Sequence, residues 1–110
     1  MPMNTVYAAS EPGRADIESL REPAVLEFGA PWCGHCQAAQ PLLEAAFAGH
    51  AKVRHFKVED GKGRPLGRAF GVKLWPTLVF LEQGREVARL VRPTQAGPIR
   101  EALALIDPIG

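Results

Sequence analysis

Short apolar runs separated by Gly and Pro residues predict a sheet of buried strands. Residues 78–81 are apolar on both faces, and residues 24–28 are apolar except for Glu27, a pattern typical of strands in the interior of a sheet. Residues 53–59 alternate between two faces and predict a third strand. A Gln-Gly pair after the second run is expected to turn the chain back as a hairpin, with a partner strand over residues 85–91.

The first part of the chain gives weaker signals. Residues 5–8 predict a short first strand. Residues 12–21 predict a helix in which Ile17 and Leu20 share one face, and Ser10 is its expected cap. Both elements would precede the first buried strand.

Residues 33–49 predict the longest helix, which would end at Gly49. Pro41 falls inside this helix and is expected to kink it, because proline removes one backbone hydrogen bond. The stripe that faces the core is expected to contain Ala38, Leu42, Ala45 and Ala46, with Leu43 and Phe47 widening it.

Two more helices complete the pattern. Residues 64–70 predict a short helix closed by Gly71. A terminal helix after Thr94 is expected to cover the sheet, with an apolar stripe of Ile99, Ala102, Leu103 and Ile106. Between them, the bond from Trp75 to Pro76 stands at the mouth of an apolar strand and is a candidate for the cis form.

At 110 residues, the chain is expected to form one domain that spans residues 1–110. Its formal net charge of +1 and its scattered basic residues indicate neither a nucleic acid nor an anionic membrane as a partner. No apolar run is long enough to span a bilayer, and residues 1–20 show no secretory signal. If Met1 is the native start, we expect a cytoplasmic protein, although the mature part of an exported precursor would look the same.

The chemistry is concentrated at Cys33 and Cys36, the only two cysteines of the chain. A helix start offers unpaired backbone N–H groups and a partial positive charge, and both favour the thiolate form of Cys33. Protonated His35 would add to this effect. Cys36 lies one helical turn later, within reach of the first sulfur. We therefore predict that an accessible Cys33 attacks a disulfide and that Cys36 resolves the mixed disulfide.

Two other uses of a cysteine pair fit this chain less well. A zinc site needs four ligands, the chain has no second cysteine pair, and His35, His50 and His55 are not spaced as in a structural zinc site. A structural disulfide between Cys33 and Cys36 would close a tiny loop and restrict the unfolded chain very little. We expect neither a metal nor a bound organic cofactor.

Glu27 lies inside a predicted buried strand, where a carboxylate is costly unless it is protonated, paired or hydrogen-bonded. If it points beneath the dithiol, desolvation raises its pKa and lets it exchange a proton with Cys36. If it points outward, it is an ordinary strand-edge charge. His55 is a candidate neighbour that would influence this proton equilibrium, although a lone strand histidine is more often structural.

The segment EFGAPWCGHC, from Glu27 to Cys36, resembles the active-site segment of protein disulfide isomerase domains, and the compact length resembles thioredoxin. The order of predicted elements over nearly the whole chain is similar to the thioredoxin fold, which implies an α/β architecture with a central mixed β-sheet flanked by helices. The resemblance further implies that Glu27 moves protons. It implies that Trp75 and Pro76 form the cis-proline segment, in which the Trp75 backbone binds an extended substrate beside Cys33 and Pro76 keeps metal ions away.

Three residues depart from that family's pattern. Gly29 stands where many members have an aromatic residue, Trp75 is bulkier than the usual aliphatic residue, and Arg92 lies near a substrate-groove glycine. They put the partner set of a standard thioredoxin in doubt. Trp32 and Trp75 are expected to form an apolar collar around the dithiol that suits an extended peptide, unless both simply pack against loops.

These observations predict a protein thiol–disulfide oxidoreductase, acting as a reductase on protein disulfide substrates and recharged by a reductase or another electron donor. We expect a monomer. One alternative is an oxidase or isomerase in an oxidising compartment, favoured by His35, which stabilises the reduced form. The other alternative is a protein-binding module that uses the dithiol only as a redox-sensitive latch.

Overall fold

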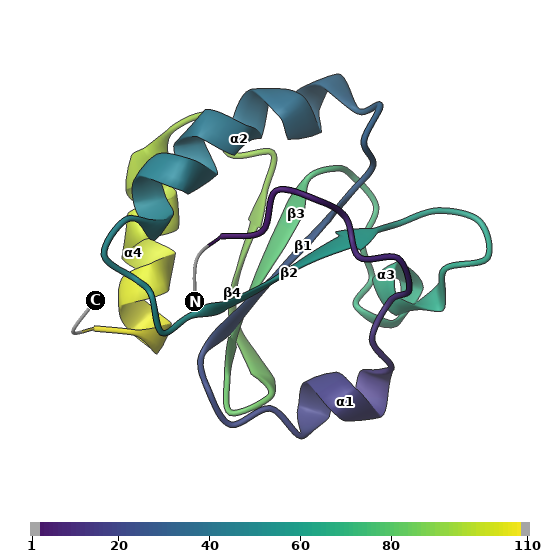
Figure 1. Ribbon diagram of the computed structural model, residues 1–110, viewed down its shortest axis with the longest axis horizontal. Coiled ribbons are helices and arrows are strands. Elements are labelled where there is room, and N and C mark those ends of the chain that lie inside the picture. Colours follow the sequence, from purple (N-terminus) through teal and green to yellow (C-terminus); the bar gives the residue numbers. More distant parts are fainter. Residues whose placement is uncertain (1–2, 109–110) are drawn as a thin grey trace.

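The computed structural model describes residues 3–108, which form a four-stranded sheet between two layers of helices (Figure 1). The strands are β1 (Ala24–Gly29), β2 (Arg54–Glu59), β3 (Thr77–Glu82) and β4 (Arg85–Val91). Their order in the sheet is β2-β1-β3-β4. β1 runs parallel to β2 and antiparallel to β3, and β3 and β4 form an antiparallel hairpin. The predicted mixed sheet flanked by helices is confirmed.

The helices are α1 (Arg14–Glu18), α2 (Gly34–Phe47), α3 (Pro65–Ala69) and α4 (Ala96–Ile106). α2 and α4 cover one face of the sheet, and α1 and α3 cover the other (Figure 1). α1 is shorter than predicted, and its N-cap is Gly13 rather than Ser10. The helix begins there because the Asp16 carboxylate turns back and accepts a hydrogen bond from the Gly13 N–H at 3.0 Å.

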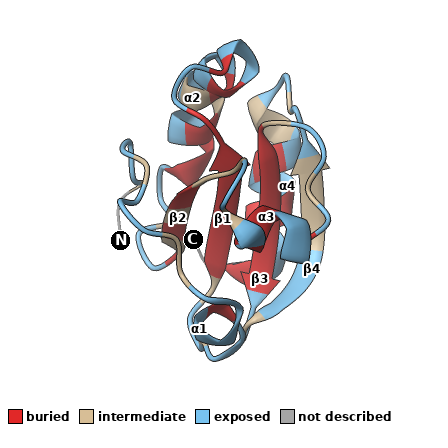
Figure 2. Cartoon of the chain, turned by 90° about the vertical axis from the view of Figure 1, so that its right-hand side faces the viewer, coloured by how far each residue is buried: buried red, intermediate tan, exposed pale blue. Residues whose placement is uncertain are grey.

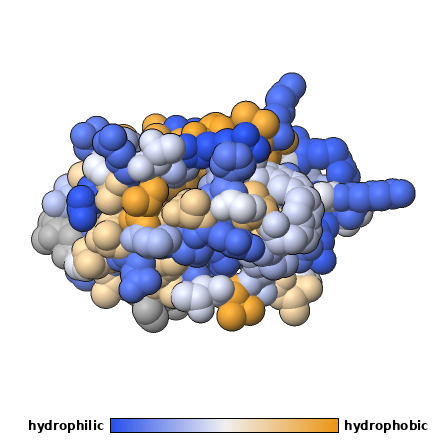
Figure 3. Space-filling view, turned by 90° about the horizontal axis from the view of Figure 1, so that it is seen from above, coloured by the Kyte–Doolittle hydropathy of each residue, from blue (hydrophilic) through white to orange (hydrophobic). Residues whose placement is uncertain are grey.

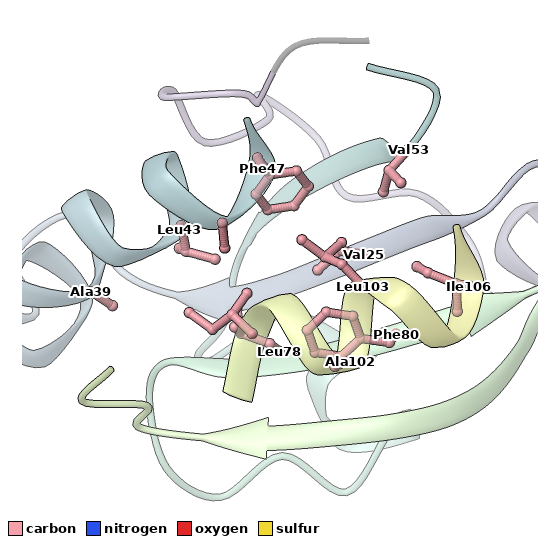
Figure 4. Packing of buried hydrophobic residues seen from close by; sticks show 12 residues of the cluster. Val25, Ala39, Leu43, Phe47, Val53, Leu78, Phe80, Ala102, Leu103 and Ile106 are labelled. Atoms are coloured by element: carbon pink, nitrogen blue, oxygen red, sulfur yellow. The ribbon is translucent and has the colours of Figure 1, made fainter. Parts of the chain in front are cut away.

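The larger part of the core lies between the sheet and the pair α2 and α4. Figure 4 shows Val25 and Phe80 from the sheet facing Leu43 and Phe47 of α2 and Leu103 of α4. The predicted stripe of α4 is confirmed, since its four members are all buried: Ile99, Ala102, Leu103 and Ile106. This packing fixes α2 against the sheet and so fixes the position of its first turn.

The buried face of α2 matches the predicted stripe only in part, because Leu43, Ala46 and Phe47 are buried as predicted and the other three residues are not. Ala38 and Ala45 are exposed, and Leu42 is only half-buried. The residues that face the core are Cys36, Ala39, Leu43, Ala46 and Phe47. Once Cys36 faces inward, the residues three, seven and ten or eleven positions later share its face, so the stripe follows from the orientation of the first turn.

The second layer of the core lies on the other face of the sheet. Ile17 of α1 and Phe70 at the end of α3 pack there against Leu26 and Phe28 of β1. Side chains alternate along a strand, so Glu27, between those two residues, lies on the opposite face, beneath α2. Figure 2 shows that the central strands are buried over most of their length, whereas β4 at the edge of the sheet is largely exposed.

The predicted strand over residues 5–8 is wrong. In Figure 1 the dark purple segment that precedes α1 runs past β2 without forming a helix or a strand. The Ala8 N–H donates to the Lys57 carbonyl at 2.9 Å. Asn4 instead bonds to His55 through its backbone N–H and its side-chain amide. Side-chain bonds of this kind hold the segment on β2 without the regular ladder of a fifth strand.

Several predicted turns are confirmed. The peptide bond between Trp75 and Pro76 is cis. Gln83 and Gly84 have φ angles of 49° and 78°, in the left-handed region that the tight turn of the hairpin requires. Pro41 lies inside α2, and the kink that we expect there remains a prediction.

Neither length nor hydropathy would let any helix within residues 3–108 cross a membrane. On the face shown in Figure 3, hydrophobic residues form small groups between hydrophilic ones.

Candidate active site

Cys33 and Cys36 lie at the start of α2, directly after β1. Cys33 is the N-cap of the helix, and its sulfur accepts a hydrogen bond from the Cys36 backbone N–H at 3.2 Å. The two residues are free thiols, with 2.6 Å between their sulfur atoms. The Cys33 sulfur therefore lies at the positive end of the helix dipole, where the first backbone N–H groups have no carbonyl partner within the helix. The geometry therefore allows attack by one sulfur and resolution by the other.

Both cysteines are more buried than the sequence led us to expect. The exposed fraction is 7% for Cys33 and 2% for Cys36. Cys33 is the more exposed of the two, but it is less accessible than we predicted. The pair packs against Ala30 and Trp75. Burial raises the pKa of Cys36 to about 11, and its hydrogen bond to Cys33 adds to this rise. Cys36 is therefore protonated at neutral pH.

Trp32 and Trp75 contact each other beside the dithiol. Their rings meet edge to face with 5.4 Å between centroids. Trp75 packs against the two cysteines, and its indole N–H donates to the Asp60 carboxylate at 2.8 Å. Trp32 is 73% exposed. The apolar surface expected from these two residues is present, with Trp75 fixed and Trp32 open to solvent.

Arg92 lies beside the Trp75–Pro76 segment and bonds to both of its carbonyl groups. Its Nε donates to the Trp75 carbonyl at 2.8 Å, and its backbone N–H donates to the Pro76 carbonyl at 2.9 Å. A peptide that bonds to the Trp75 carbonyl must therefore share it with Arg92. His35 is exposed on the first turn of α2 and lines, together with Arg92, a pocket of about 250 Å³.

Glu27 lies beneath α2 and is fully buried, so the inward orientation is the correct one. Its Oε1 is 2.8 Å from His55 Nε2, and its Oε2 accepts hydrogen bonds from Lys57 Nζ at 2.8 Å and from Gln40 Nε2 at 2.9 Å. The Asn4 N–H donates to His55 Nδ1, so Nε2 is the nitrogen that carries the proton and donates to Glu27.

These partners overturn the expected pKa of Glu27. Burial alone would raise it, as we predicted, but the hydrogen bond from His55 and the positive charge of Lys57 outweigh burial. The pKa of Glu27 is lowered, and the side chain is a carboxylate at neutral pH. The prediction of a raised pKa is wrong because it included desolvation and left out the cation.

Gln40 joins this carboxylate to the dithiol. Its amide nitrogen also donates to the Cys36 carbonyl at 2.9 Å, and its oxygen accepts from Lys57 Nζ at 3.1 Å. Sequence reasoning missed both Gln40 and Lys57. A signal existed for each, since Lys57 stands two residues after His55 on one face of β2, and Gln40 lies one helical turn after Cys36.

A cavity of about 390 Å³ opens beside Cys36. Tyr7 from the N-terminal segment lines it, together with Gln40 and Lys57. Tyr7 was also missed, because residues 5–8 give only a weak strand pattern. Within residues 3–108, no three His, Cys, Asp or Glu side chains gather as they would around a metal ion.

Comparisons with known proteins agree with this geometry. The sequence profile of the thioredoxin family matches residues 5–104. The structure is similar to that of thioredoxin 2 from Pseudomonas aeruginosa PAO1 in its reduced form, with 55% sequence identity and a TM-score of 0.86. That match covers 98% of this chain and 100% of the other.

Curated relatives include both thioredoxins and protein disulfide isomerases. The chain is 39% identical over 84 residues to a thioredoxin of Haemophilus influenzae, a match that covers 70% of this chain and 77% of the relative. It is 48% identical over 66 residues to the protein disulfide-isomerase tigA of Aspergillus niger. That match covers 56% of this chain but only 18% of the isomerase. The likeness to the isomerase is therefore confined to one part of a much longer protein.

Proposed function

This chain belongs to the thioredoxin family of thiol–disulfide oxidoreductases, and on that premise we propose that it reduces disulfide bonds in proteins. Cys33 attacks the substrate and Cys36 resolves the mixed disulfide. The observation that carries this proposal is the position of two free thiols, 2.6 Å apart, at the first turn of a helix whose Cys36 N–H points at Cys33 Sγ.

The reaction consists of two exchanges. The Cys33 thiolate attacks one sulfur of the substrate disulfide, a Cys33–substrate bond forms, and the other substrate sulfur leaves as a thiolate. Cys36 then loses its proton and attacks Cys33 Sγ. The Cys33–Cys36 disulfide forms, the second substrate sulfur leaves with the electron pair and takes up a proton, and the substrate is reduced by two electrons.

Two neighbouring residues adjust these steps. His35, when protonated, stabilises the Cys33 thiolate and so favours the reduced form of the pair. Glu27 is ionised at neutral pH, so we assign it the role of accepting, rather than donating, a proton during the second exchange. Gln40, which bonds to both Glu27 and the Cys36 carbonyl, keeps the carboxylate in place for this role.

Trp32, Trp75 and Pro76 form the surface on which we place the substrate. The contact of the two indoles beside the dithiol provides an apolar area for an extended or unfolded segment. Trp75 also offers backbone groups to such a segment, in competition with Arg92 for the carbonyl.

The partners of the chain follow from this activity. They are protein disulfides on one side and, on the other, a reductase or another electron donor that restores the dithiol. We propose a cytoplasmic monomer, since a pair of exchange-competent cysteines suits a reducing compartment and the relatives include bacterial thioredoxins.

Insulin offers a direct test, because reduction of its interchain disulfides makes one chain precipitate. With dithiothreitol as donor, the wild-type protein should accelerate precipitation, and Cys33→Ser should return the rate to that of dithiothreitol alone. Ser10→Ala, an exposed change far along the chain from the dithiol, serves as the control and should behave as wild type. Failure of the wild-type protein to accelerate the reaction would favour the redox-sensitive latch instead.

The oxidase or isomerase alternative has its own support in His35 and in the partial match to a protein disulfide-isomerase. A measured reduction potential separates the two. A value near the roughly −270 mV of thioredoxin fits a reductase, whereas a value near roughly −180 mV fits an isomerase.

A further inference from the structure

Tyr7 places its phenol hydroxyl beside the sulfur of Cys36. A Cβ atom at Gly29 would lie 2.5 Å from Cys36 Sγ and 3.0 Å from the Tyr7 hydroxyl oxygen. The two groups therefore converge on the same side of Gly29, in space that a larger residue at this position would fill. Both groups also line the cavity of about 390 Å³ beside the dithiol.

The segment that carries Tyr7 is anchored on both sides of the ring. Asn4 bonds to His55, and the Ala8 N–H donates to the Lys57 carbonyl. Between these anchors, Lys57 Nζ lies 4.5 Å from the centre of the Tyr7 ring, within the range of a cation–π interaction. The ring is held over β2, and its hydroxyl end reaches the first turn of α2.

We propose that Tyr7 donates a hydrogen bond to the Cys36 thiolate and thereby speeds the resolving step. The proposal rests on the proposed function, because it takes Cys36 as the resolving cysteine. It gives the N-terminal segment a chemical role, and it gives a reason for glycine at position 29, where any side chain would separate the two groups.

The charges around the two groups agree with this role. Burial raises the pKa of Tyr7 well above its usual value, and the nearby negative charges of Cys36 and Glu27 raise it further. The phenol therefore keeps its proton and remains a donor. Burial and Cys33 raise the pKa of Cys36, and hydrogen bonds from the Ala30 backbone and the Tyr7 hydroxyl act in the opposite direction. A hydrogen bond to an ionised acceptor is stronger than one to a neutral acceptor, so Tyr7 stabilises the thiolate more than the thiol.

Tyr7 only donates a hydrogen bond and takes no part in the proton transfer of the resolving step. The proton of Cys36 goes to solvent or to Glu27, the Cys36 thiolate attacks Cys33 Sγ, and the substrate thiolate leaves. Tyr7 loses no proton. The other charged groups near Cys36 are Glu27 and Lys57, which pair with each other. In the mixed disulfide Cys33 is neutral, which leaves the Ala30 backbone N–H and the Tyr7 hydroxyl as the donors that face the new thiolate.

The test compares Cys33→Ser with Cys33→Ser/Tyr7→Phe, so that Cys36 is the single cysteine of each protein. Alkylation of Cys36 by iodoacetamide is followed against pH. The inflection should rise by about one pH unit without the hydroxyl, which lowers the thiolate fraction at neutral pH about ten-fold. Because a more basic thiolate is a better nucleophile, the alkylation rate should fall only about three-fold. Thr5→Val, which removes a hydroxyl from the same exposed segment, should leave the inflection unchanged.

A second measurement starts from the tyrosine. Tyr7 is the only tyrosine of the chain, so the absorbance of tyrosinate near 295 nm reports its ionisation alone. Replacement Cys36→Ala removes the acceptor and should lower the titration midpoint of Tyr7, with far-UV circular dichroism confirming that the fold is kept over the range compared.

An alkylation inflection that does not move in Tyr7→Phe, or a Tyr7 titration that Cys36→Ala leaves unchanged, overturns the proposal. Neither measurement needs a substrate or an electron donor. Their outcome is therefore independent of the insulin assay, which tests the proposed function.

Discussion

Two regions of the active site hold their reactive groups in different ways. One is the first turn of α2, and the other is the polar cluster beneath it, which consists of Glu27, Gln40, His55 and Lys57. Cys33 and Cys36 come from one helical turn, and a backbone N–H of that same turn supports Cys33 Sγ. Glu27 is held instead by side chains of β2 and α2 that stand between 13 and 30 residues away in the sequence.

The charge of the reactive group therefore depends on backbone dipoles in one region and on neighbouring side chains in the other. Backbone dipoles at a helix start remain as long as the helix exists, so a substitution there changes reactivity more than folding. A buried carboxylate stays charged only while its cation and its hydrogen-bond donors are present. Substitutions in the cluster should therefore affect stability strongly, and substitutions on the first turn of α2 should affect the redox equilibrium.

Removal of Lys57 should have the largest effect on stability. Lys57→Met leaves the buried Glu27 without its cation, and we expect a loss of about 3 kcal/mol in the free energy of unfolding, measured by urea denaturation. Glu27→Gln/Lys57→Met should recover much of this loss, because the double variant leaves no unpaired charge. A double variant whose destabilisation equals the sum of the two single variants would show that the pair does not act as a unit.

The pH dependence of stability checks the same pair. The pKa of Glu27 is lower in the folded state than in the unfolded state, so the unfolded chain takes up the proton first as the pH falls. The wild-type protein should lose stability below about pH 4.3, the usual value for Glu. In Lys57→Met the folded pKa rises, and this acid-dependent loss should shrink. An equally steep acid limb in both proteins would contradict the assigned cause.

Substitutions on the first turn of α2 should change the reduction potential of the dithiol. His35→Pro removes a group that stabilises the Cys33 thiolate, while proline is tolerated in a first helical turn. We expect a reduction potential about 30 mV more negative, equivalent to about 1.4 kcal/mol, with stability nearly unchanged. His35→Lys places a positive charge at the same position and should not produce this negative shift. A potential that shifts equally in both variants would point to the helix turn rather than to charge.

Sequence reasoning succeeded where the signal lies in neighbouring residues. The stripe of α4, the hairpin turn at Gln83 and Gly84, and the cis bond at Pro76 all depend on local spacing or on residue type. The dithiol belongs to the same class, because two cysteines at i and i+3 on a helix are close whatever the rest of the chain does. These features need no knowledge of strand register.

The predictions that failed depend on packing between distant segments. Part of the buried face of α2 was misplaced because Leu42 and Leu43 are equally apolar, and only the inward orientation of Cys36 selects Leu43. Lys57 was missed because only the register of β1 with β2 places it opposite Glu27. Tyr7 belongs to a segment held by isolated backbone and side-chain hydrogen bonds, which leave no periodic pattern to detect.

Trapping of the mixed disulfide tests directly which cysteine attacks the substrate. Cys36→Ser and Cys33→Ser are each incubated with an oxidised protein substrate and run on a gel without reductant. We expect a covalent complex with Cys36→Ser that disappears on addition of dithiothreitol, and none with Cys33→Ser. A complex that forms with Cys33→Ser and not with Cys36→Ser would contradict it.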